Sequence, residues 1–216
     1  MSRDTMEMDR IEATALGIAD EHGCHTVVLY GSYARGDAGD GSDVDLLYIR
    51  DAGPTLRDAR HIDGVYFDGF VYPQDAFTTI DTALLRIAGG RVLRERDGAG
   101  TALLERVRDR FTKGPDPLAA DDRNMRIVWA HKMLGRAQSA DGVEADYRRM
   151  SLILQALEDY FALRTLWFRG AKVAFPWLQL HDDAAYAAFE TAARPAADHD
   201  ALAALVNVVY GELPAG

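Results

Sequence analysis

Two apolar runs separated by a polar, glycine-rich stretch constrain the fold of this chain more than any other feature. Residues 25–30 (HTVVLY) form a short β-branched run that predicts a buried strand, and Gly31-Ser32 interrupts it abruptly. A Gly- and Asp-rich stretch follows, and a second apolar run at 44–49 predicts another strand. The pattern predicts two neighbouring strands whose connection begins and ends with groups able to bind a ligand.

The first of these groups is suited to anions. Gly31 is small enough for the backbone to approach a ligand closely. Ser32 offers a hydroxyl and an N–H at the start of a predicted short helix, a place that favours phosphates. Arg35 either contacts a phosphate or caps this helix, and Ser42 either caps the start of the next strand or donates to the phosphates.

The second group is suited to a cation. Asp43 and Asp45 are two residues apart at the start of the second predicted strand, so both carboxylates point to one face. Adjacent carboxylates repel each other unless a cation lies between them, and Mg²⁺ completed by substrate phosphates suits such a site. A phosphate-binding turn beside a dicarboxylate metal site indicates phosphoryl or nucleotidyl transfer. An ordinary solvated loop would leave the aspartates in an apolar strand unexplained.

Gly31-Ser32, ten residues, and then Asp43-Val-Asp45 resemble the signature of the nucleotidyltransferase superfamily that includes DNA polymerase β. The longer form, GSYARG followed by SDVDLL, is most similar to the minimal and antibiotic-modifying nucleotidyltransferases. The resemblance implies a third acidic residue on a following central strand, with an apolar neighbour on either side.

Asp68 matches that third position, in a strand predicted at 65–72 and ended by Pro73. Asp63 is the competitor, but Asp63-Gly64 is typical of the turn before this strand. The resemblance therefore implies a metal site of Asp43, Asp45 and Asp68.

The second half of the chain is predicted to be helical. The Pro-Asp-Pro segment at 115–117 is the best candidate linker. The sequence thus predicts an α+β fold: a small mixed sheet with flanking helices over residues 1–117, then a bundle of four or five helices over 118–216. The first half is predicted to contain helices around 11–18, at 57–61, 75–87 and 102–111 and an edge strand at 91–96, and the second half helices at 124–138, 147–169, 184–193 and 201–210.

The predicted helix at 147–169 resembles the helical domain of kanamycin-type nucleotidyltransferases, although this resemblance is weaker than that of residues 31–45. It combines a narrow polar stripe with an otherwise apolar surface, which predicts burial nearly all round. In those enzymes an acidic residue on this helix is the general base for the acceptor hydroxyl, which implies Asp159 in that role, with Glu158 as the alternative. A helix acid paired with an arginine is an equally open interpretation.

Composition limits the partners and the compartment. The 34 acidic and 24 basic residues give a net charge of −10, which argues against nucleic acid or an anionic membrane as a partner. Cys24 is the only cysteine, so no intramolecular disulfide can form. Without an apolar run of membrane-span length or a secretory signal, the sequence predicts a cytoplasmic protein.

The resemblance implies an enzyme that moves a nucleoside monophosphate, with AMP the first choice, from a Mg²⁺-bound NTP such as ATP to an acceptor hydroxyl and releases pyrophosphate. An acidic protein suits an aminoglycoside-like polycation as small-molecule acceptor, and hence a role in antibiotic resistance. Two alternatives stay open: an antitoxin-type enzyme that adenylylates a protein, and a catalytically silent nucleotide-binding module. An apolar face left on the bundle would support a homodimer.

Overall fold

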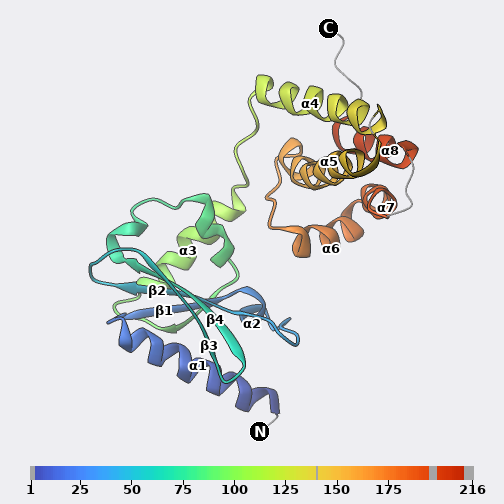
Figure 1. Cartoon of the computed structure of the whole chain (residues 1–216). Helices are drawn as coiled ribbons and strands as arrows, with labels where there is room; N and C mark the ends of the chain where they lie inside the picture. Colours follow the sequence, from blue (N-terminus) through green and yellow to red (C-terminus); the bar gives the residue numbers. More distant parts are fainter. Residues whose placement is uncertain (1–2, 140, 195–198, 212–216) are drawn as a thin grey trace. The chain divides into compact units, whose positions relative to one another are not determined.

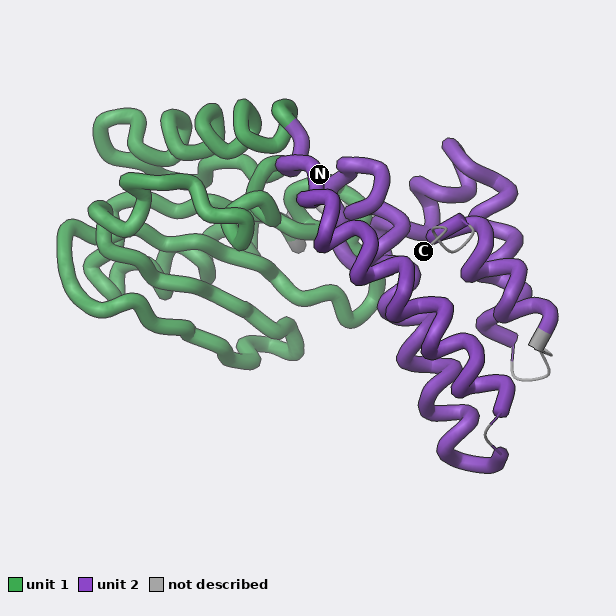
Figure 2. Tube along the Cα trace, turned by 90° about the horizontal axis from the view of Figure 1, so that it is seen from above, with its two compact units in different colours: residues 1–113 green, residues 114–216 purple. Residues whose placement is uncertain are grey.

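The computed structural model describes residues 3–139, 141–194 and 199–211. The chain divides into two compact units, Met1–Lys113 and Gly114–Gly216 (Figure 2). Each unit encloses an apolar core of its own. A mixed α+β unit followed by a helical unit confirms the predicted fold class.

Unit 1 is built on a five-stranded mixed sheet with the strand order β3-β4-β2-β1-β5 (Figure 1). The two strands β2 and β4 run parallel to each other, and the other neighbouring pairs are antiparallel. The strands are β1 (Thr26–Tyr30), β2 (Val44–Arg50), β3 (Leu56–Ile62), β4 (Val65–Pro73) and β5 (Arg91–Arg94). The predicted strands at 25–30, 44–49, 65–72 and 91–96 are confirmed, with ends that differ by at most two residues.

Helix α1 (Arg3–Glu21) covers one face of this sheet. Its residues Ile11, Ala15 and Ile18 recur at helical spacing and are buried, as the sequence predicts. They belong to the same apolar cluster as Leu46 and Tyr48 of β2, and the Tyr48 hydroxyl donates to the Ala15 carbonyl at 3.2 Å. Because side chains alternate along a strand, the odd-numbered residues of β2 face away from α1.

The opposite face of the sheet is partly covered by helix α3 (Ala99–Thr112), which contacts β1 and β5. Helix and sheet approach closely at Gly100, where a Cβ atom would lie 3.0 Å from methyl groups of Thr26 and Val92. Two 3₁₀ helices, η1 (Gln74–Phe77) and η2 (Thr82–Ile87), lead from β4 to β5. This arrangement gives unit 1 one face covered by α1 and one face on which α3 leaves room for polar side chains.

Two expectations for unit 1 are wrong. Residues 57–61 lie in strand β3 and not in a helix. Their side chains alternate between half-buried and exposed positions, and Asp63-Gly64, with φ angles of 50° and 81°, forms a two-residue turn that pairs β3 with β4 in a hairpin. The predicted helix at 75–87 is instead two 3₁₀ helices, because Asp81 adopts an extended conformation and its side chain caps η2 by accepting from the Ala83 N–H.

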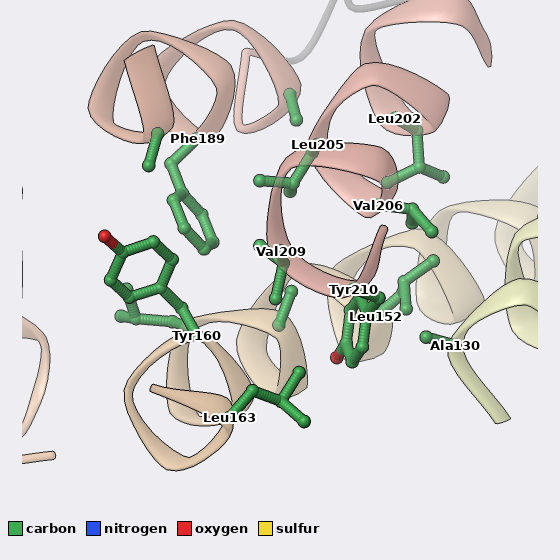
Figure 3. Close-up of a cluster of buried hydrophobic side chains, with 14 of the residues drawn as sticks. Ala130, Leu152, Tyr160, Leu163, Phe189, Leu202, Leu205, Val206, Val209 and Tyr210 are labelled. Atoms are coloured by element: carbon green, nitrogen blue, oxygen red, sulfur yellow. The ribbon is translucent and has the colours of Figure 1, made fainter. Parts of the chain in front are cut away.

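Unit 2 packs its helices around an apolar core. Figure 3 shows Leu205, Val206 and Val209 of the last helix within a cluster that includes Leu152 and Phe189. The helices in the described part of unit 2 are α4 (Ala120–Ser139), α5 (Gly142–Leu163), α6 (Ala171–His181), α7 (Asp183–Ala192) and α8 (His199–Tyr210). None of the described helices of the whole chain combines the length and the apolarity that a membrane-spanning helix requires.

Two differences from the prediction concern helices α5 and α6. Helix α5 ends at Leu163, whereas the sequence predicts a helix that continues to residue 169. The helix stops because Thr165 has a φ of 56° and the Leu166 N–H donates back to the Phe161 carbonyl at 2.9 Å. Helix α6 is absent from the prediction because Gly170 and Pro176 signal breaks, yet Pro176 lies inside α6.

Helix α5 is not buried nearly all round, which corrects the expectation from its apolar composition. Tyr147, Met150 and Leu154 are 68%, 57% and 71% exposed, and Val143 continues the same stripe at 86%. The spacing of these four residues places them on one side of the helix. The unit therefore has an exposed apolar face, and a homodimer that uses such a face stays a prediction.

The start of helix α7 gives a prediction for unit 2. The Asp182 side chain accepts from the Ala185 N–H at 3.0 Å and from the Tyr160 hydroxyl at 2.6 Å. These hydrogen bonds hold the pKa of Asp182 below its ordinary value of 3.8, so their stabilisation is present above that value and is lost as the pH falls through the lowered pKa. We expect Asp182→Ala to lower the free energy of unfolding of unit 2 by about 1 kcal/mol at neutral pH, and by less and less below pH 3.8.

All three tryptophans of the chain, Trp129, Trp167 and Trp177, belong to unit 2, so urea unfolding followed by tryptophan fluorescence measures this unit selectively. Asp182→Asn is the control, because asparagine caps the helix without a charge, so its stability should lie between those of the native chain and Asp182→Ala. A loss of stability in Asp182→Ala that is the same at neutral and at acidic pH would contradict the role assigned to the charged carboxylate.

Candidate active site

Two neighbouring strands, β2 and β4, bring Asp45 and Asp68 together on the sheet face that points away from α1. Asp45 of β2 and Asp68 of β4 are direct partners in the parallel pairing of these strands. Tyr30, the last residue of β1, is the partner of Asp45 on its other side. Because direct cross-strand partners point to the same face, the strand order places the Asp45 and Asp68 carboxylates side by side.

Gly31 lies directly against the Asp45 carboxylate. It has a φ of 74°, and a Cβ atom there would overlap Asp45 Oδ2 and lie 2.9 Å from Asp45 Cγ. The sequence predicts a close approach of the Gly31 backbone to a ligand, which stays a prediction. The structure shows a close approach to the Asp45 carboxylate, and this approach also requires glycine. The short helix α2 (Gly31–Arg35) begins at this residue, and the adjoining Ser32 is buried.

Asp43 lies just before β2 and is exposed. The pKa of Asp45 is raised above its ordinary value of 3.8, first by burial and then by the negative charges of Asp68 and Asp43. The guanidinium groups of Arg86 and Arg35 act in the opposite direction. The predicted repulsion between carboxylates is thus present at Asp45, which makes this position favourable for a cation.

Asp68 is held by a residue that sequence reasoning missed. Arg57 of β3 donates two hydrogen bonds to it, from Nε to Oδ1 at 2.7 Å and from Nη2 to Oδ2 at 2.8 Å. The ion pair in turn raises the pKa of Arg57.

Across the described ranges, no three His, Cys, Asp or Glu side chains are gathered closely enough to hold a metal ion. The three predicted ligands are therefore near one another without forming a ready-made metal cluster.

Arg86 of η2 is the second residue that sequence reasoning missed. Its guanidinium lies 4.4 Å from the ring centroid of Phe70 and 5.7 Å from that of Tyr30. Arg57 lies 5.5 Å from the same Phe70 ring. Two arginines thus stack on aromatic side chains next to the aspartates, an arrangement that favours a bound anion such as a phosphate chain.

Arg35 and Ser42 lie in or near the segment that connects α2 to β2. The Arg35 guanidinium pairs with Asp37 at 3.1 Å, and the Ser42 hydroxyl accepts from the Gly39 N–H at 3.0 Å. Ser42 and Asp43 also line a surface hollow of about 690 Å³ between this segment and the β3–β4 turn. Both residues have local partners in this structure, and their phosphate-binding role stays a prediction.

Asp159 belongs to unit 2 and is fully buried. Its carboxylate forms an ion pair with Arg126 and accepts from Gln155 at 3.0 Å and from the Tyr210 hydroxyl at 2.8 Å. The pairing of a helix acid with an arginine, which the sequence leaves open, is present. Glu158 is exposed, and the role of either acid as a general base stays a prediction.

These contacts predict a large structural effect at Asp159. Asp159→Ala leaves the buried Tyr210 hydroxyl, Gln155 and Arg126 without their shared acceptor, and we expect unit 2 to lose about 3 kcal/mol of unfolding free energy. Glu158→Ala, one residue away and exposed, should change it by no more than about 0.5 kcal/mol. Urea unfolding followed by tryptophan fluorescence measures both variants, and equal losses would contradict the structural role of the Asp159 network.

The segment that carries Asp43, Asp45 and Asp68 is similar to a known protein family. Residues 17–71 match the family model described as "Nucleotidyltransferase domain". Unit 1 resembles a nucleotidyltransferase domain. The matched segment includes Gly31, Asp43, Asp45 and Asp68 and all of strands β1, β2 and β3. The match supports the superfamily predicted from the sequence and, with it, nucleotidyl transfer as the general activity.

Among solved structures, a nucleotidyltransferase-like protein from Exiguobacterium sibiricum 255-15 is similar to this chain, with 13% sequence identity and a TM-score of 0.44. The alignment covers 93% of this chain and 77% of that one. No curated protein matches the sequence.

Proposed function

We propose that this protein transfers a nucleoside monophosphate, AMP by first choice, from an NTP to an acceptor hydroxyl and releases pyrophosphate. The observation that supports this proposal most is the placement of Asp45 between Gly31 and Asp68, within the segment that matches a nucleotidyltransferase domain. In such a transfer the acceptor oxygen bonds to the α-phosphorus, and the bond from that phosphorus to pyrophosphate breaks. The acceptor proton passes to a base, for which the resemblance to kanamycin-type nucleotidyltransferases implies Asp159 or Glu158.

The residues of the site fit Mg²⁺ as the metal. The donors are carboxylate oxygens, which hard divalent cations prefer, and burial, followed by the charges of Asp68 and Asp43, raises the pKa of Asp45. Asp43, Asp45 and Asp68 would hold the ion, with phosphate oxygens completing its shell. When bound, Mg²⁺ would neutralise phosphate charge and favour departure of pyrophosphate.

The arginines of the same face are suited to the phosphates. The Arg86 guanidinium is oriented by the rings of Tyr30 and Phe70, so little side-chain freedom remains to be lost when an anion binds. Arg35 is the last residue of α2, the short helix that begins with Gly31 and Ser32. These positive charges offset the negative site and would orient the triphosphate before transfer.

A label-transfer experiment tests the proposal. NTPs labelled at the α-phosphate are incubated with Mg²⁺ and an aminoglycoside, a lincosamide or a cell extract, and pyrophosphate release is measured in parallel. We expect label on an acceptor and none with Asp45→Asn. Label on a small molecule supports the antibiotic-modifying role, and label on a protein supports the antitoxin-type alternative. Nucleotide binding without pyrophosphate release under any condition would favour the silent module and contradict the proposal.

A further inference from the structure

Asp68, one of the proposed metal ligands, already forms an ion pair with Arg57. Asp68 is only 17% exposed, and each of its two oxygens accepts a hydrogen bond from Arg57. A carboxylate held in this two-point manner uses one lone pair of each oxygen, and the guanidinium places a positive charge where a metal ion would otherwise be. A metal ion and Arg57 therefore compete for Asp68.

The hairpin geometry explains why Arg57 reaches Asp68. The direct partner of Asp68 on β3 is Ala59, and the direct partner of Arg57 on β4 is Phe70. Arg57 thus lies diagonally across from Asp68 on the same face, and the small side chain of Ala59 leaves the space open. The contact is set by strand pairing and by side-chain size.

Arg57 is also able to leave. Its side chain is 54% exposed and lies on β3, an edge strand, so movement of the guanidinium disturbs no buried packing. Phe70 beneath it provides an aromatic surface that it shares with Arg86. Arginine pairs with phosphate in the same two-point geometry as with carboxylate, so a triphosphate offers Arg57 an equivalent partner on this face.

We propose that Arg57 keeps Asp68 from the metal until a nucleotide arrives, and then exchanges Asp68 for the phosphates of that nucleotide. The inference rests on the proposed function, because it takes the nucleotide site to be this face of unit 1. This exchange makes metal and nucleotide binding cooperative. The metal alone finds Asp68 held by Arg57, whereas the metal with an NTP can bind all three carboxylates.

Replacement of Arg57 therefore has opposite effects on two ligands. In Arg57→Gln, which keeps much of the side-chain stem, Mn²⁺ alone should bind about tenfold more tightly, because Asp68 is released. The complex of Mn²⁺ with a non-hydrolysable ATP analogue should bind about tenfold more weakly, because a phosphate contact is lost. A purely structural role for the ion pair would weaken both or neither.

The experiment titrates the full chain with Mn²⁺ and follows free Mn²⁺ by electron paramagnetic resonance, first without and then with the analogue. Arg57→Lys is a second variant that keeps the charge, and a single-point donor should give an intermediate Mn²⁺ affinity. Arg96→Gln is the matched control, since the Arg96 side chain is about as exposed as that of Arg57 and forms an ion pair with the exposed Asp51 at the other end of β1. It should leave both affinities unchanged.

The outcomes separate this inference from the proposed function. Equal Mn²⁺ affinities for the native chain and Arg57→Gln would overturn the competition, and tighter Mn²⁺ binding with unchanged analogue binding would overturn the exchange. The Mn²⁺ titration needs no turnover, whereas the label-transfer experiment measures turnover directly. A chain that transfers label while Arg57→Gln leaves Mn²⁺ binding unchanged keeps its proposed function and loses the inference.

Discussion

Gly31→Ala is expected to abolish nucleotidyl transfer, with kcat/KM reduced by about a thousandfold. A Cβ atom at residue 31 would overlap the Asp45 carboxylate, so either Asp45 or the β1–α2 backbone must move. A displacement of Asp45 separates it from Asp68, its neighbour on β4. Alanine is also strained by about 1–2 kcal/mol at the φ of 74° that residue 31 adopts. The measurement is kcat/KM for pyrophosphate release.

A matched glycine separates strain from overlap. Gly23 precedes β1 and has a φ of 63°, but a Cβ atom there would meet no heavy atom of the described chain within 4 Å. Gly23→Ala should therefore lose only the stability that the backbone strain costs and keep its activity. Hydrogen exchange of β1 and β2 peptides measures the stability of unit 1, which contains no tryptophan. Equal losses of activity in the two variants would show that strain alone is responsible.

Asp45→Asn should reduce kcat/KM by about a thousandfold, because it removes the most central carboxylate while keeping its size. The same substitution should make the metal-free protein more stable at neutral pH. Burial and the charges of Asp68 and Asp43 raise the pKa of Asp45, so ionisation of this group costs stability as the pH rises through the raised pKa. Asparagine avoids that cost, and the gain should be about 1 kcal/mol.

The pH dependence provides the check on Asp45. Thermal unfolding in a chelator should show the gain at neutral pH, and the gain should shrink as the pH falls toward the ordinary value of 3.8. Asp51→Asn is the contrasting control, since Arg96 holds the pKa of the exposed Asp51 below its ordinary value and no gain is expected. An Asp45→Asn variant that is less stable than the native chain at neutral pH, or that remains active, would contradict this account.

Local patterns in the sequence were sufficient to predict the strands that bear Asp45 and Asp68. Apolar residues, β-branched side chains and the Asp63-Gly64 turn signal are properties of neighbouring residues, and they mark β1, β2 and β4. The strand order could not be predicted in this way, because it depends on pairings between distant segments. That order is what makes Asp45 and Asp68 direct neighbours.

The arginines of the site illustrate what local patterns miss. Arg57 was expected on a helix, because β3 is rich in charged residues and its alternation becomes meaningful only once β3 pairs with β4. Arg86 lies 41 positions after Asp45 in a 3₁₀ helix, and no sequence signal links the two. For Asp159 the sequence allows two roles, a general base or a partner in an ion pair with an arginine. Only the packing of α4 against α5 identifies Arg126 as that partner.

We propose that Asp43, Asp45 and Asp68 form a metal-dependent nucleotide site on one face of unit 1. Isothermal titration of the full chain with a non-hydrolysable ATP analogue, in Mg²⁺ and then in a chelator, tests it most directly. We expect binding in Mg²⁺ that is lost both in the chelator and in Asp45→Asn. Equal affinity with and without the metal, unaltered by Asp45→Asn, would contradict the claim.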